Sequence, residues 1–134
     1  MKKISQISFA VIFALMLLSC KNTKQKLQEY VISYNTEAKN FKSDHVTLTT
    51  ARGYINDNKI ELRFETDLAQ NDSNKSIAIK QFPNLLKEML DKDQIPKELV
   101  NEGVQFDVYF LAADNTVFAK EIVNAETMPE LIKK

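Results

Sequence analysis

The first amphipathic pattern of the chain lies between residues 24 and 42. Apolar side chains recur there at steps of three or four positions, and charged or polar side chains fill most other positions. This spacing places the apolar groups on one stripe of an α-helix, which can be buried against a core. We therefore predict a helix over residues 24–42 with a stripe of Leu27, Tyr30, Val31, Tyr34, Ala38 and Phe41.

A two-residue alternation follows the helical pattern and predicts a β-hairpin. Residues 46–55 are rich in β-branched side chains, and Asn56-Asp57-Asn58 supplies residues that tolerate the left-handed backbone of a tight turn. Beyond the turn, residues 59–65 alternate strictly between charged and apolar side chains, which is typical of a strand with one buried face. Gly53 is a candidate for a bulge in the first strand.

A second helical stripe precedes a short helical segment. Its apolar positions include Ala78, Phe82, Leu85 and Met89. Pro83 lies inside this pattern, and an interior proline costs a helix about 3 kcal/mol. The helix therefore starts near Gln81, or starts near Ser76 and is kinked or broken, and we favour the second alternative. Residues 96–102 predict another short helix, with Pro96 at its start and Gly103 just beyond its end.

The last hairpin has the clearest alternation. Residues 104–111 and 117–123 form its strands, and residues 112–116 turn the chain. Pairing Leu111 with Val117 places Phe110 opposite Phe118 and Phe106 opposite Ile122 on the core side. The same register places Lys120 on the core side opposite Val108, an unfavourable position for an ammonium group.

The order helix, hairpin, helix, hairpin predicts an α+β fold. Two α-β-β units would form a four-stranded antiparallel sheet with both helices packed on one face, which buries all the apolar stripes. The other face would be mixed in character and could meet a partner. We take Glu61, Arg63, Glu65 and Tyr109 as the candidate partner-binding face. The full set expected there is Lys59, Glu61, Arg63, Glu65, Asp107, Tyr109, Leu111 and Val123.

The first twenty residues have the organisation of a secretion signal. Lys2 and Lys3 precede an apolar run from Ile7 to Leu18, interrupted only by Ser8. A bilayer-spanning helix needs roughly 20 apolar residues, so this run fits a signal peptide better than an anchor. Leu17-Leu18-Ser19-Cys20 then resembles the lipobox of bacterial lipoproteins. The expected organisation is a signal peptide at 1–19, a lipidated cysteine and polar tether at 20–26, and one domain at 27–134.

The resemblance implies that Cys20 receives a diacylglyceryl group and becomes the first residue of the mature protein, usually with a further acyl chain on its amino group. Two or three acyl chains meet the requirement for stable membrane anchoring. By resemblance to sorting in Gram-negative bacteria, Lys21 after the cysteine implies the outer membrane. The absence of an acidic cluster in residues 21–24 favours the periplasmic face.

The composition excludes several partners and chemistries. The chain has 18 basic and 18 acidic side chains and lacks the basic excess of a nucleic-acid binder. His45 is the single histidine and Cys20 the single cysteine, so a usual zinc site and an internal disulfide are not expected. With two glycines, the chain also has no phosphate-binding loop. No metal, cofactor or catalytic residue is predicted.

A non-catalytic protein-binding module is the function that remains after these exclusions. A tethered domain of this size could be an envelope accessory or assembly factor, or an immunity or inhibitor lipoprotein. The alternative is a small-molecule or lipid carrier, which requires a cavity lined by Phe64, Phe82, Phe106 and Phe110. A small hydrolase is the third possibility and requires a cleft that holds His45 or two converging carboxylates.

Overall fold

The computed structural model describes residues 22–133. The predicted signal peptide, the lipobox and Cys20 lie outside the described residues. The helices and strands appear along the chain as α2 (Thr23–Glu37), η1 (Ala38–Asn40), β1 (Val46–Tyr54), η2 (Ile55–Asp57), β2 (Lys59–Thr66), α3 (Asp72–Asp91), α4 (Lys97–Asn101), β3 (Gln105–Leu111), β4 (Val117–Val123) and α5 (Met128–Lys133).

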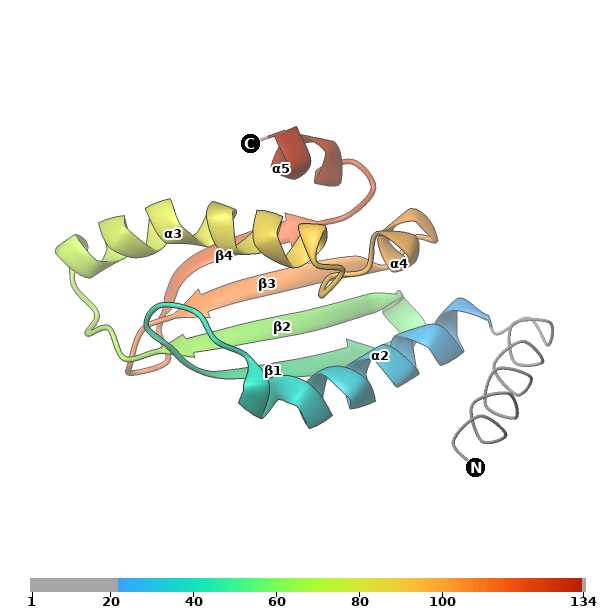
Figure 1. Cartoon of the computed structure of the whole chain (residues 1–134), viewed down its shortest axis with the longest axis horizontal. Helices are drawn as coiled ribbons and strands as arrows, with labels where there is room; N and C mark the ends of the chain where they lie inside the picture. Colours follow the sequence, from blue (N-terminus) through green and yellow to red (C-terminus); the bar gives the residue numbers. More distant parts are fainter. Residues whose placement is uncertain (1–21, 134) are drawn as a thin grey trace, which may run out of the picture.

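The α+β fold class is confirmed. Four strands form one sheet in the order β1-β2-β3-β4, and the helices lie together in front of it in Figure 1. The apolar side chains of the strands meet the apolar stripes of the helices in one core, centred on Ile60, Leu62, Phe64, Phe106 and Phe110, which are all 0% exposed.

The sheet is mixed rather than antiparallel throughout. Both predicted hairpins are antiparallel, but the central pair β2–β3 is parallel. The cause is the length of α3: 20 residues at 1.5 Å each run about 30 Å. This matches the length of β2, so the chain returns to the end of the sheet where β2 started, and β3 then runs in the same direction (Figure 1).

The helix α3 runs through Pro83 as one continuous helix, so a break at this proline is wrong. The helix also begins earlier than expected, where the side chain of Asn71 accepts a hydrogen bond from the Asn74 amide at 2.8 Å. Buried residues lie on both sides of the proline, among them Phe82 and Leu86. Their packing offsets the propensity cost of Pro83, because helix stability in a protein comes mainly from a buried face.

A bulge corrects the predicted register of the last hairpin. Leu111 pairs with Val117 as expected, but Phe110 then pairs with Ala119, so Phe118 is an extra residue in β4. Lys120 consequently lies on the open face beside Tyr109, and the conflict with a buried ammonium disappears. The same shift turns Val123 into the core, where it is 0% exposed, and not onto the open face as predicted.

Gly53 is explained by close helix packing and not by the predicted bulge, because the irregularity in β1 lies between Val46 and Leu48. A β-carbon on Gly53 would lie 3.0 Å from Leu27 Cδ2 and 3.3 Å from Val31 Cγ2. The missing side chain therefore lets α2 approach β1 closely.

The outer edge of β1 is closed by a side chain of α2. The side-chain oxygen of Asn35 accepts a hydrogen bond from the Ala51 amide at 2.8 Å, and its nitrogen donates to the Ala51 carbonyl at 2.9 Å. Asn35 thus satisfies both backbone groups of an edge residue, as a neighbouring strand would. This contact reduces the tendency of β1 to pair with another chain.

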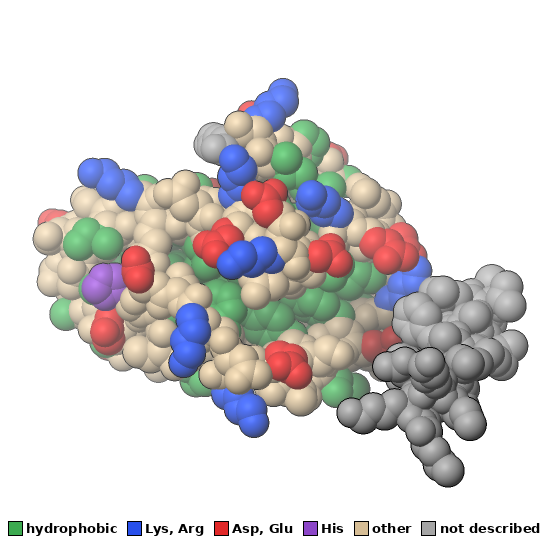
Figure 2. Space-filling model, in the orientation of Figure 1, with side chains coloured by type: hydrophobic (Ala, Val, Ile, Leu, Met, Phe, Trp, Pro, Cys, Tyr) green, Lys and Arg blue, Asp and Glu red, His purple; other side chains and the backbone are tan. Residues whose placement is uncertain are grey.

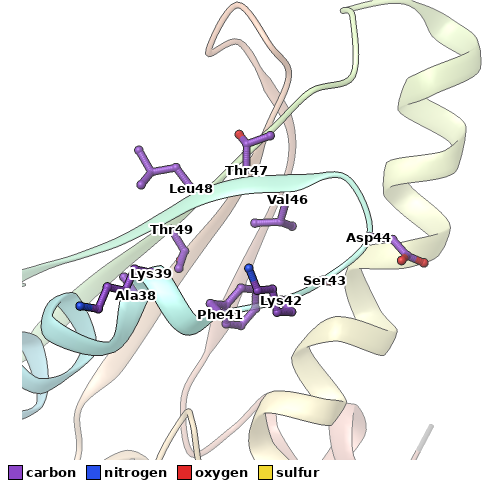
Figure 3. A pocket seen from close by; sticks show the side chains of 10 residues that line it. All are labelled: Ala38, Lys39, Phe41, Lys42, Ser43, Asp44, Val46, Thr47, Leu48 and Thr49. Atoms are coloured by element: carbon purple, nitrogen blue, oxygen red, sulfur yellow. The ribbon is translucent and has the colours of Figure 1, made fainter.

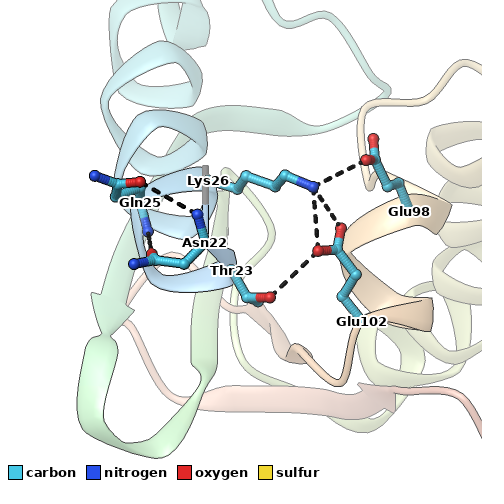
Figure 4. A network of polar contacts seen from close by, with 6 residues as sticks. All are labelled: Asn22, Thr23, Gln25, Lys26, Glu98 and Glu102. Carbon is cyan, nitrogen blue, oxygen red and sulfur yellow. Dashed lines mark hydrogen bonds and ion pairs between the residues drawn. The ribbon is translucent and has the colours of Figure 1, made fainter. Parts of the chain in front are cut away.

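The described part of the predicted tether, residues 22–26, is helical from Thr23 onward. Asn22 and Gln25 form a capping box, and α2 begins at Thr23. Figure 4 shows how this first turn is held: Lys26 Nζ lies 3.0 Å from Glu102 and 3.1 Å from Glu98 of α4. The hydrogen bonds to Glu102 and then to Glu98 raise the pKa of Lys26. Capping and these contacts stabilise a turn whose composition alone resembles a linker.

Candidate functional site

Two surfaces of the molecule are candidates for binding, and they lie on opposite faces of the sheet. The open face is the side away from the helices, and within residues 22–133 no helix covers it (Figure 1). The second surface, which we call the interhelical groove, lies between α2 and the connection from α3 to α4. The predicted site residues belong to the open face.

The structure places the four predicted residues on the open face. Glu61, Arg63 and Glu65 alternate along β2, and the parallel register sets Tyr109 beside Arg63. A shallow hollow of about 300 Å³ is lined by Glu61, Arg63 and Tyr109 together with Leu111, Asn115 and Val117. Glu65 is not part of this hollow and lies between Leu48 and Leu111 in the register.

Neighbouring side chains compensate the charges of the open face. Glu61 accepts a hydrogen bond from the Tyr54 hydroxyl at 3.3 Å and lies 3.9 Å from Arg63. Asp107 is nearly buried, accepts a hydrogen bond from Gln105 at 2.8 Å, and has Lys59 at 3.7 Å. These contacts run both along a strand and between neighbouring strands, and they leave the face without a dominant charge.

Cations also lie over the aromatic rings of this face. The ammonium of Lys120 is 5.2 Å from the centre of the Tyr109 ring, and its pKa is raised, chiefly by its hydrogen bond with Tyr109. The ammonium of Lys59 is 4.9 Å from the centre of the Tyr54 ring. Apolar groups remain exposed at the sides of the face, with Leu48 at 51%, Val117 at 54% and Ile122 at 36%.

The interhelical groove arises because the two long helices cover different strands. The main sheet contacts of α2 are with β1, whereas those of α3 are with β4. The hollow left between them has a volume of about 430 Å³, and Figure 2 shows hydrophobic side chains gathered in this gap. Its lining consists of Tyr30, Ser33, Tyr34, Glu37, Ala38, Asn40 and Phe41 on one wall and Asp93, Gln94 and Pro96 on the other.

Tyrosine rings form the deep part of the groove. The Tyr30 ring packs edge-on against Phe106, with 5.4 Å between ring centres, and its hydroxyl donates to the Gln94 carbonyl at 2.7 Å. The hydroxyls of Tyr34 and Thr49 share a hydrogen bond of 2.6 Å. Burial raises the pKa of Tyr30 well above its ordinary value and that of Tyr34 to about 12. Both phenols therefore stay protonated at neutral pH.

The charged groups in the groove lining are both carboxylates. Glu37 lies at the end of α2 and accepts a hydrogen bond from the Asn40 side chain at 2.9 Å. Asp93 lies on the other wall, in a turn where its backbone adopts a φ of 60°. No lysine or arginine is among the residues that line this hollow. Sequence reasoning missed the groove because helical spacing identifies core tyrosines but not the divergence of two helices.

A more basic recess adjoins the groove at its far end. It has a volume of about 420 Å³ and shares Ala38 and Phe41 with the groove. Figure 3 shows Val46 and Thr49 pointing from β1 toward Phe41, with Thr47 and Leu48 on the other side of the strand. Lys39 and Lys42 are the cations of its lining, and both are exposed.

The interior aromatics proposed for a carrier cavity are close-packed. Phe64, Phe82, Phe106 and Phe110 are at most 1% exposed. The ring centres of Phe82 and Phe110 are 5.4 Å apart, and those of Phe41 and Phe64 are 5.3 Å apart. None of the hollows described above is lined by these four residues. Because these four side chains are closely packed, they do not line a ligand cavity between the sheet and the helices.

The candidate residue for hydrolysis lies at the surface. His45 Nδ1 is 3.2 Å from a carboxylate oxygen of Asp67, and both side chains are exposed, at 44% and 62%. Among residues 22–133, no three His, Cys, Asp or Glu side chains are grouped so that they could hold a metal ion. Over the same residues, no helix is long and apolar enough to cross a membrane.

Comparison with known proteins does not assign this chain to a family. No protein-family model matches the chain, and no curated protein matches it. One solved structure is similar: that of the type II secretion system pilotin AspS from Vibrio cholerae, which is 10% identical over 77% of this chain and 95% of that chain. The TM-score of 0.39 is too low for this likeness to assign a family or a function.

Proposed function

We propose that this chain is a lipid-anchored protein of the bacterial cell envelope whose domain binds a protein partner without catalysing a reaction. The anchor is the expected lipid on Cys20, and the membrane is expected to be the outer membrane, on its periplasmic face. The partner surface is the open face of the sheet. The roles that fit are an envelope accessory or assembly factor and an immunity or inhibitor lipoprotein.

The uncovered sheet face is the observation that carries this proposal. It combines exposed apolar side chains at its sides with Arg63, Tyr109 and Lys120 in adjacent register positions. Arginine and tyrosine are among the side chains enriched at the energetic centres of protein interfaces. The shallow hollow at Tyr109 gives a partner side chain a place to insert.

The test is affinity purification of the lipidated protein from its own envelope, with mass spectrometry of the proteins that accompany it. Arg63→Glu reverses a charge on the open face, and Lys75→Glu makes the same change on an exposed position of α3. Cys20→Ala removes the lipid and reports whether the partner depends on anchoring.

A single stoichiometric protein that accompanies the wild type and Lys75→Glu but not Arg63→Glu supports the proposal. Two results contradict it. The first is the same partner bound equally by Arg63→Glu. The second is a lipid or small molecule that co-purifies with no protein, which would favour the carrier.

A further inference from the structure

The interhelical groove has the shape and lining of a second binding surface, separate from the open face. It lies above the central strands, where α2 and α3 diverge, and its volume of about 430 Å³ is open at the surface in Figure 2. The aromatic rings of its floor rest on the core through Phe64 and Phe106. The floor is therefore fixed before anything binds, which lowers the entropic cost of binding.

The side chains of the groove define an occupant that is apolar on its inner side. The hydroxyls of Tyr30 and Tyr34 already have partners inside the protein, Gln94 and Thr49. These tyrosines therefore offer mainly ring surface to a ligand. Phe41, Ala38 and Pro96 add apolar surface along the same hollow.

The groove also determines the secondary structure that its occupant should have. Its walls are a helix and a turn, so they offer no free row of backbone amides and carbonyls to which an extended strand could pair. At Ala51, the outer edge of β1 is already occupied by Asn35. Buried backbone groups need hydrogen-bond partners, and a helix satisfies them internally.

The length of the groove fits about two helical turns. Tyr30 and Glu37, which both line it, are seven residues apart on α2, or about 10 Å at 1.5 Å per residue. Apolar side chains at positions i, i+3, i+4 and i+7 of a partner helix span the same distance.

The charges of the groove determine the sign of the charge that its occupant should carry. Glu37 and Asp93 lie on opposite walls, and the groove lining itself contains no cation, since Lys39 and Lys42 line the adjoining recess. A helix with lysine or arginine beside its apolar stripe would place those cations next to the two carboxylates. An anionic amphiphile such as a fatty acid would bring its own carboxylate toward them.

We propose that the interhelical groove binds a short amphipathic, basic helix of a partner protein, with apolar side chains on the tyrosines and cations beside Glu37 and Asp93. This surface is independent of the open face, so the domain can hold two protein segments on opposite sides of one sheet.

Photo-crosslinking in the native envelope tests this proposal. Benzoylphenylalanine is placed in the lipidated protein either at Ser33, an exposed residue of the groove wall, or at Thr50, an exposed residue of the open face. Mass spectrometry then identifies the peptide linked to each position. Position 33 is expected to capture one segment of another protein that has a helical apolar stripe and a net positive charge.

Binding of the captured segment, made as a synthetic peptide, gives the second readout. Ser33→Trp fills the groove and is expected to abolish binding, with thermal unfolding as the check that the variant is folded. The double variant Glu37→Gln/Asp93→Asn is expected to weaken binding about five- to tenfold at low salt, because it removes two exposed ion pairs. Glu130→Gln, which removes an exposed carboxylate on α5 that lines neither surface, is the control and should leave the affinity unchanged.

Several outcomes would overturn the proposal: a captured segment that is acidic or forms a strand, a lipid or a second copy of this chain linked at position 33, or no product at that position. Affinity that is unchanged in the double variant would overturn the charge argument. Products at position 50 test the open face separately, so either surface can fail without the other.

Discussion

The two faces of the sheet present different chemistry although the same four strands build both. On the open face, carboxylates lie beside lysine, arginine and tyrosine, so charges are compensated within the face. On the helix-covered face, the strands contribute buried apolar side chains, and the carboxylates of the groove have no cation in its lining. One face is nearly neutral and shallow, and the other is hollowed, aromatic and acidic along its gap.

This difference shows that binding surfaces can arise in two ways. The open face follows directly from strand alternation, which sends every second side chain away from the core. The groove forms because the helices cover this face incompletely: α2 packs near the β1 edge of the sheet and α3 near the β4 edge. The open face can therefore change with little effect on the fold, whereas much of the groove is part of the core.

The largest expected effect is the loss of a core aromatic under the groove. Phe106 is fully buried beneath Tyr30, so Phe106→Ala should lower the free energy of unfolding by about 3–5 kcal/mol. Tyr109→Ala, on the same strand but on the open face, should cost roughly 1 kcal/mol or less. Urea unfolding of both variants measures the difference. Equal losses would break the distinction between the two faces.

The next effect tests the close approach of α2 to β1. Gly53→Ala places a methyl group 3.0 Å from Leu27 Cδ2, and overpacking of this kind should cost about 1–3 kcal/mol. Adding Leu27→Ala removes the clash, so the double variant should lose less stability than the sum of the single changes. Thr50→Ala, on the open face of the same strand, is the control and should have little effect. Additive losses would contradict the clash.

The pH dependence of stability should report on the groove tyrosines. The pKa of Tyr34 is about 12 in the folded protein because of burial, against about 10 when unfolded. Below pH 10, Tyr34 keeps its proton in both the folded and the unfolded state, so its ionisation does not lower the free energy of unfolding. As pH rises from about 10 through 12, the unfolded state loses its proton first, so stability falls.

Tyr34→Phe should make that decline shallower, although it also removes the hydrogen bond with Thr49, which contributes about 1 kcal/mol at neutral pH. Urea unfolding between pH 8 and pH 12 measures both effects. The same slope in the wild type and the variant would show that Tyr34 does not titrate with unfolding.

The smallest expected effect on stability is at the predicted binding face. The Arg63 side chain is 45% exposed and lies 3.9 Å from Glu61, so Arg63→Ala should change the free energy of unfolding by about 0.5 kcal/mol or less. Its partner binding should fall while its unfolding curve stays near that of the wild type. A loss above about 2 kcal/mol would mean that the open face serves the fold rather than a partner.

Much of the fold was predictable because its local signals are strong. Alternation along residues 59–65 identified β2 and its outward residues, and helical spacing identified the buried side of α2. Pro83 was misleading, because the packing of Phe82 and Leu86 outweighs a local propensity. The predicted pairing of Phe110 with Phe118 was wrong for a different reason, although Phe118 lies in the core as expected. A one-residue bulge leaves no mark in an alternating pattern, yet this one moves Lys120 from the predicted core side to the open face and Val123 from the predicted open face to the core.

The candidate binding surfaces also divide into one that the sequence predicted and one that it did not. Strand alternation placed Glu61, Arg63, Glu65 and Tyr109 on one face, because a side chain on a strand can point to only two sides. The groove could not be predicted, since Glu37 and Asp93 are 56 positions apart and belong to different elements. The sequence by itself determined which residues face the core, because burial follows periodicity. Only the tertiary structure decided the parallel central pair and the gap between α2 and α3. Both depend on how helices and strands that are far apart in the sequence pack against one another.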